Sequence, residues 1–106
     1  MTEINKLAEA VRLATDYQTN KRILREKIQT DLHFAESGGL FKITPELLAF
    51  VASWPEEVDQ MFLEDVYGNP IEISRHTFLI RAQQHYQMVM NRWHQQHGEL
   101  KKLRKV

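Results

Sequence analysis

The sequence predicts an α+β protein: two long antiparallel helices, one N-terminal and one C-terminal, with a short middle helix and a small antiparallel β-sheet that contains a hairpin. Residues 3–32 contain no proline or glycine and are rich in helix-forming residues. Residues 75–104 repeat apolar side chains at steps of three and four. Residues 35–74 hold turn residues between short β-prone runs.

A chain of 106 residues fits a single domain, residues 1–106. We divide it into a long helix in 1–34, an acidic α/β insert with a hairpin in 35–74 and a long basic helix in 75–106. The expected boundaries of the terminal helices are 3–32 and 75–104. The expected strands are 40–43, 60–66 and 71–74.

The first helix is indicated by one apolar stripe. Its first part consists of Ile4, Leu7, Val11 and Ala14, and an overlapping part continues on the same face through Ala10, Ala14, Tyr17, Leu24 and Ile28. Lys21 interrupts it with a charge, and a lone polar residue in such a seam commonly sets the register between helices. We therefore expect the whole stripe to face the other long helix.

The middle of the chain is organised by turn signals. Ser37-Gly38-Gly39 is interpreted as the turn that leads out of the first helix. Thr44, Pro45 and Glu46 are typical of an N-cap and a first helical turn, so a short helix should run to about Ser53. The hairpin should turn at Gly68 or Asn69 with a positive φ.

The third helix has the clearest periodicity in the chain. Its apolar positions are Leu79, Ala82, Tyr86, Val89, Trp93, Leu100 and Leu103, and only Gln96 breaks the series. Ser74 precedes the helix and is expected to cap it. Helices of this length extend about 45 Å and must project from the small sheet.

Some apolar residues fall outside both stripes and suggest contact with a second chain. They are Ile23, Phe78, Ile80 and Met88. A monomer would expose them, whereas a symmetric copy can cover them with the same patch on both partners. The sequence therefore predicts a homodimer with these four residues in the interface.

The neutral net charge conceals a segregation: residues 1–34, 35–74 and 75–106 carry +1, −7 and +6. One interpretation is neutralisation within or between chains, with cations near a helix C-terminus. The alternative is a basic strip that contacts nucleic-acid phosphates, with Trp93 and Tyr86 available for stacking. The strip would consist of Arg75, Arg81, Arg92, Lys101, Lys102, Arg104 and Lys105.

No pattern in the chain indicates catalysis. The absence of cysteine excludes a thiolate zinc site and a cysteine nucleophile, and the glycine patterns of phosphate loops and hydrolase elbows are missing. His94 and His97 are three residues apart and could share a metal ion, but no third ligand lies nearby in the sequence. We expect no enzyme activity, no catalytic residue, no cofactor and no metal, while metal binding by these two histidines stays open.

The location of the protein is predicted from what its sequence lacks. No apolar run approaches the ~18 residues that span a bilayer, and the first residues lack the order of a secretory signal. The sequence thus predicts a cytoplasmic protein without a membrane partner.

Residues 5–17, 63–70 and 101–106 carry a resemblance that covers most of the chain. In these segments the chain resembles small uncharacterised proteins of contractile-tailed phages that infect marine cyanobacteria. The resemblance implies a phage protein made in a bacterial cytoplasm and transfers no functional residue. Small phage proteins of this kind often act by binding. The leading hypothesis is a self-associating protein–protein interaction module with an unidentified protein partner, and the alternative is a nucleic-acid-associated accessory protein.

Overall fold

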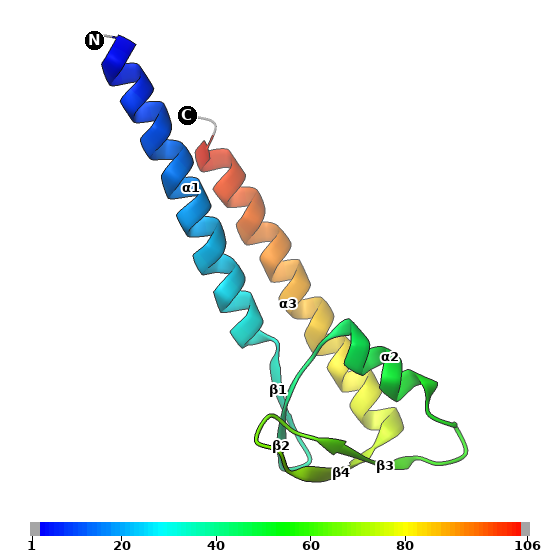
Figure 1. The fold of residues 1–106 in the computed structure, drawn as a ribbon. Coiled ribbons are helices and arrows are strands. Elements are labelled where there is room, and N and C mark those ends of the chain that lie inside the picture. Colours follow the sequence, from blue (N-terminus) through cyan, green and yellow to red (C-terminus); the bar gives the residue numbers. More distant parts are fainter. Residues whose placement is uncertain (1–2, 105–106) are drawn as a thin grey trace.

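The computed structural model describes the backbone of residues 3–104 and the side chains of residues 3–102. It is an elongated molecule of 70 × 23 × 18 Å with a helical stalk and a small head (Figure 1). The elements in chain order are α1 (Glu3–Asp31), β1 (His33–Glu36), β2 (Gly39–Lys42), α2 (Pro45–Ser53), β3 (Gln60–Glu64), β4 (Pro70–Ser74) and α3 (Arg75–Arg104). We call residues 3–31 and 86–104 the stalk and residues 32–85 the head. The α+β class, the long antiparallel terminal helices and the short middle helix are confirmed.

The strands form two separate antiparallel hairpins, and the expected single sheet is wrong. β1 pairs with β2, and β3 pairs with β4. Residues 33–36 were not expected to be a strand, because the glycines after Ser37 were interpreted as the turn out of the first helix. In the structure Ser37 and Gly38 have φ values of 54° and 83°, which suit a two-residue turn of type I′ that joins β1 directly to β2.

Asp65 joins the two hairpins. Its carboxylate is buried and accepts hydrogen bonds from the backbone N–H groups of Leu40 (3.3 Å), Tyr67 (3.0 Å) and Asn69 (2.9 Å). The N–H of Val66 donates to the carbonyl of Leu40 at 2.8 Å. Gly68 closes the same loop with a φ of 79°, so the expected positive φ at this turn is confirmed.

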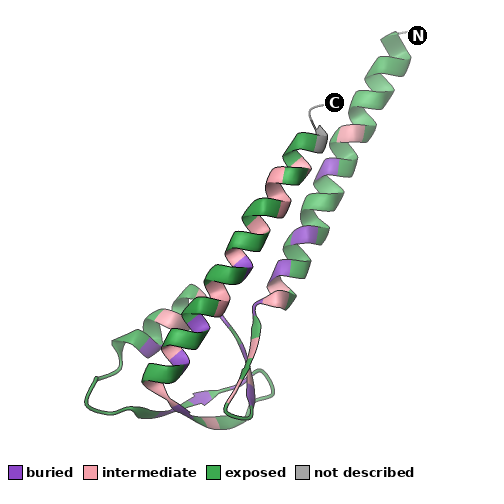
Figure 2. Ribbon diagram, turned by 180° about the vertical axis from the view of Figure 1, so that it is seen from behind, coloured by how far each residue is buried: buried purple, intermediate pink, exposed green. Residues whose placement is uncertain are grey.

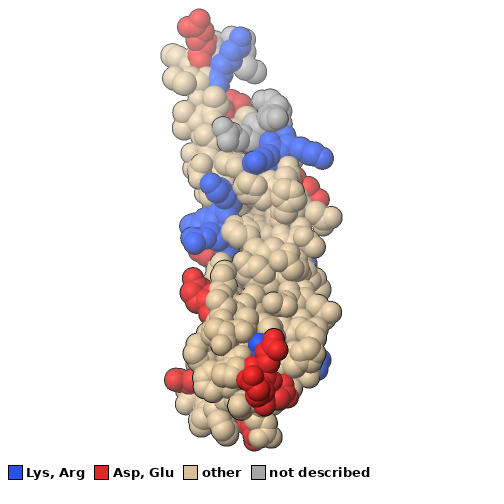
Figure 3. Space-filling model, turned by 90° about the vertical axis from the view of Figure 1, so that its right-hand side faces the viewer, with Lys and Arg blue, Asp and Glu red and all other residues tan. Residues whose placement is uncertain are grey.

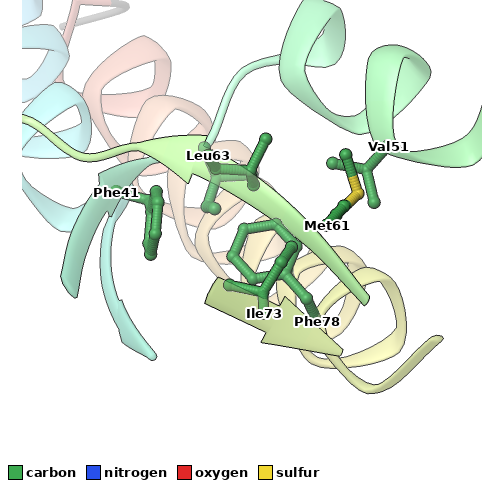
Figure 4. Packing of buried hydrophobic residues seen from close by; sticks show 8 residues of the cluster. Phe41, Val51, Met61, Leu63, Ile73 and Phe78 are labelled. Atoms are coloured by element: carbon green, nitrogen blue, oxygen red, sulfur yellow. The ribbon is translucent and has the colours of Figure 1, made fainter. Parts of the chain in front are cut away.

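The head has a core drawn from both hairpins, α2 and the beginning of α3. Figure 4 shows Phe41, Leu63 and Ile73 of the strands beside Phe78 of α3, with Val51 of α2 and Met61 of β3 close by. The ring of Phe78 meets the ring of Phe41 edge-on, with centroids 5.2 Å apart. These contacts fix the first turns of α3 inside the head.

Polar groups fasten the ends of α2 and α3. Thr44 caps α2 by accepting the N–H of Leu47, as expected from the sequence. The cap of α3 differs from expectation, because Asp59 accepts the N–H of His76 at 3.0 Å and the hydroxyl of Ser74 donates to Asp59 at 2.7 Å. Asp59, 15 residues before Ser74, therefore takes the capping role.

The stalk is held by a second, smaller core. Leu24 and Ile28 of α1, together with Leu32 at the start of the head, pack against Val89 of α3, and partly buried side chains such as Trp93 flank them. Since the first turns of α3 belong to the head, α1 lies against only the later part of α3. The N-terminal turns of α1 extend past the end of α3 and are exposed (Figures 1 and 2). The expected mutual cover of the two helices over their full length is wrong.

Acid should destabilise the head through Asp65. The backbone N–H of Asn69, aided by those of Leu40 and Tyr67, holds the pKa of the Asp65 carboxyl below its usual range against the opposing effect of burial. A group with a lowered pKa in the folded state stabilises the fold above its unfolded pKa, about 4, and loses that contribution as pH falls through the folded value. The hydroxyl of Ser74 and the N–H of His76 lower the pKa of Asp59 in the same direction.

We therefore expect Tm to decrease as pH falls below about 4, and Asp65→Asn to lower Tm by several degrees at pH 7 and to flatten the acid decrease. Both oxygens of the Asp65 carboxylate accept from backbone N–H groups, and asparagine replaces one of these oxygens by an NH₂ group. Because an NH₂ group cannot accept, one hydrogen bond is lost. Thermal melts followed by circular dichroism measure both effects. Glu57→Gln, at an exposed position, is the control and should resemble the unmodified protein. Equal acid decreases in the unmodified protein and Asp65→Asn would contradict this role of Asp65.

Candidate functional site

The four residues predicted for self-association occupy different environments. Ile23, Ile80 and Met88 are exposed on the long helices, as the prediction requires. Phe78 is only 1% exposed and belongs to the head core, so its assignment to an interface between chains is wrong. The reason is that β1 and β2 cover α3 from a side that the helical stripe did not predict, and Phe34 and Phe41 meet the Phe78 ring there.

Three of the four arginines of the predicted basic strip are engaged by their own chain. Arg75 donates from Nε to the carbonyl of Val51 and from Nη2 to that of Ala52, both at 3.0 Å, at the C-terminus of α2. Arg81 pairs with Glu36 at 3.3 Å, and Arg92 pairs with Asp31 at 3.5 Å. Their contact with nucleic acid stays a prediction.

Two lysines of that strip lie in the last turn of α3. Lys101 and Lys102 are exposed there. The side chain of Arg104 and all of Lys105 lie outside the part of the chain that the structure describes.

The first candidate surface is the free end of α1, which we define as residues 3–14. Ile4, Leu7 and Val11 are exposed by 78%, 67% and 57%. Their spacing of three and four places them on one side of the helix. Arg12 forms ion pairs with Glu9 and Asp16 on the helix surface. The free end is therefore an amphipathic helix whose apolar side has no cover from the described part of the chain.

Sequence reasoning missed this surface because it treated the apolar positions of α1 as one stripe. At 3.6 residues per turn, Ile4, Leu7 and Val11 lie about 100° around the axis from the side of Tyr17, Leu24 and Ile28. The buried residues of α1 are those last three. The angular offset was available from the spacing and could have identified the free end.

The second candidate surface is a pocket in the seam between α1 and α3, with a volume of about 260 Å³. We call it the cationic pocket. It is lined by Lys21, Arg25, Met90, Trp93, His94 and His97. Lys21 is exposed and therefore does not interrupt a buried seam.

Two observations bear on metal binding in this region. The structure places no group of three His, Asp or Glu side chains among residues 3–102 where they could hold a metal ion together. Lys21 and Arg25 line the same pocket as His94 and His97, and their positive charges oppose a metal cation. The electrostatics of the pocket favour an anion.

Three carboxylates have lowered pKa values: a hydrogen bond from Arg12 lowers that of Glu9 on the surface of α1, while Asp59 and Asp65 serve the fold of the head. Asp59 binds the N-terminus of α3, and Asp65 binds the backbone of the two hairpins. Neither Asp59 nor Asp65 lines the cationic pocket or the neighbouring pocket that Lys27 lines. The chemistry that the described surfaces offer is apolar contact at the free end of α1 and anion recognition in the cationic pocket.

The reassignment of Phe78 predicts a contrast between two α3 residues. Phe78→Ala should destabilise the protein by about 3–5 kcal/mol, because it empties the centre of the head. Met88→Ala should change the free energy of unfolding by less than about 0.5 kcal/mol, because the side chain is exposed. Urea unfolding of both variants measures the difference. Similar small losses for both would show that Phe78 is not a core residue.

None of the helices in the described part of the chain is sufficiently long and apolar to cross a bilayer. No protein-family model matches the chain, and no curated protein and no solved structure shows significant similarity to it. The free end of α1 and the cationic pocket are therefore the features that bear on the function.

Proposed function

We propose that the protein is a phage-encoded, non-enzymatic assembly module of the bacterial cytoplasm that self-associates through the free end of α1. The observation that carries the proposal is the exposed apolar side formed by Ile4, Leu7 and Val11. Contiguous apolar surface on a helix that projects from its own fold is typical of protein–protein contact.

The free end is suited to a helix partner because small residues surround its large apolar ones. Ala8, Ala10 and Ala14 are exposed on the same turns as Leu7 and Val11. Alanine permits a second helix to approach closely, and the ion pairs of Arg12 keep charge on the surface of these turns. A second helix packed along this apolar side would cover the side chains of Ile4, Leu7 and Val11, which α3 leaves exposed.

The distribution of charge favours a second copy in an antiparallel, two-fold arrangement. Beyond the free end, α1 carries the cations Lys21, Arg22 and Arg25. A parallel pair of copies would bring these cations together, whereas an antiparallel overlap of the free ends points them in opposite directions. The acidic heads, which contain residues 35–74 with their net charge of −7, then also lie far apart.

Replacing Leu7 and Val11 together by Glu should convert the assembly into a folded monomer. The change puts two charges into the apolar contact, and desolvating them costs more than the contact can supply. The side chains are exposed in the single chain, so the helix content should be preserved. Size-exclusion chromatography with light scattering measures the mass, and circular dichroism checks the fold.

A matched control replaces Ile23 and Met88 by Glu, since these side chains are 51% and 49% exposed elsewhere on the stalk. It should keep the mass of the unmodified protein. If this control becomes the monomer and the Leu7/Val11 variant does not, the interface lies at the sequence-predicted residues and not at the free end. A mass of 12.6 kDa for the unmodified protein at about 100 µM, the mass of a single chain, would overturn the proposal.

A further inference from the structure

We propose that the cationic pocket binds one nucleotide unit, with the phosphate on Lys21 and Arg25 and the base against Trp93. The nucleotide could be free or part of a single strand, since both present the same phosphate and base. The inference is independent of the self-association proposed above, because the pocket and the free end involve different residues.

The charge of the pocket comes from both helices. Lys21 and Arg25 lie one turn apart on α1, so their cationic groups can reach the same anion. His94 and His97 add ring nitrogens from α3, and no carboxylate lines the pocket. An anion that enters therefore meets donors from two sides and no repulsive group among the lining residues.

Arg25 stands apart from the other arginines whose side chains the structure describes. Each of the others has an ion pair or hydrogen bond within the chain: Arg12, Arg22, Arg75, Arg81 and Arg92. Within residues 3–102, Arg25 forms neither. The guanidinium group of Arg25 therefore keeps its donors free in a pocket that Trp93 also lines.

Trp93 provides an aromatic surface for a base, which a site for phosphate alone does not need. It is partly buried against the stalk core of Leu24, Ile28 and Val89, which holds the indole in place. The remainder lines the pocket beside Met90. An indole held rigidly beside cations is the combination that recognises a base and its phosphate together.

The volume of the pocket limits the class of ligand that it can hold. A volume of about 260 Å³ lies just below the usual range of ligand pockets, which favours one nucleotide over a larger cofactor. Duplex nucleic acid offers no unstacked base to an indole, so a single strand or a free nucleotide is the better fit.

Acidic side chains gather over the head, while most of the Lys and Arg side chains visible in Figure 3 lie over the stalk. An incoming polyanion is thus guided toward the stalk.

The experiment uses the full chain with Trp54→Phe, which leaves Trp93 as its single tryptophan. Adenosine monophosphate should quench the Trp93 fluorescence in a saturable manner, and inorganic phosphate should compete with it. Adenosine should bind about tenfold or more weakly, because it lacks the charged group. Lys21→Glu and Arg25→Glu should each weaken the nucleotide by about tenfold or more.

Lys27→Glu is the matched control, because Lys27 is an exposed cation of the same helix that lines a different pocket with Asn20 and Glu99. Its effect should stay below about twofold. If Lys27→Glu weakens binding as much as Lys21→Glu, the effect is one of net charge and the site is wrong. Circular dichroism verifies that each variant is folded.

A ten-residue oligothymidylate distinguishes the two sources of the ligand. Tighter binding than the monophosphate, with a steep decrease as salt rises, indicates a single strand. Equal or weaker binding indicates a free nucleotide. Absence of saturable quenching by both ligands overturns the proposal, and so does equally tight binding of a ten-residue polyglutamate, which would show a site for acidic protein segments.

Discussion

The constraint on which the rest of the structure depends is that one helix, α3, serves two partners. Phe78 and Ala82 are buried in the head, Val89 is buried in the stalk, and Tyr86 packs against both cores. α1 begins its contact with α3 only above the head, yet the two helices have nearly equal lengths of 29 and 30 residues. α1 must therefore extend beyond α3, and its first turns lose the partner that their apolar residues need.

The junction between head and stalk fixes the register of this arrangement. Ile43 donates its N–H to the carbonyl of Leu32 at 2.9 Å, and the Nε2 of His85 lies 2.7 Å from the carbonyl oxygen of Asp31. Because these contacts anchor the end of α1 against β2 and α3, they also set which turns face each other higher in the stalk. The same register places Lys21 and Arg25 opposite Trp93 and His97.

Local signals in the sequence were sufficient for most elements and insufficient for their assembly. Thr44 and Pro45 predicted the start of α2 correctly, because a cap and a first-turn proline act within a few residues. The glycines after Ser37 were interpreted as the turn out of the first helix, whereas the first of them lies in the turn between β1 and β2, and the strand before this turn was missed as a result. Phe78 was misassigned because the side of α3 that the head covers depends on β1 and β2, which are distant in sequence. The cationic pocket could not be predicted from the sequence, because Arg25 and Trp93 come from different helices and meet only through the register of the stalk.

The central claim is that a second copy covers the free end of α1. Amide hydrogen exchange tests it directly in the unmodified protein, because a short helix without a packing partner is marginally stable and exchanges rapidly. Protection of residues 3–14 should rise between about 1 and 100 µM protein, while protection of residues 24–31, already packed on α3, should stay constant. Exchange of residues 3–14 that does not change with protein concentration would contradict the account.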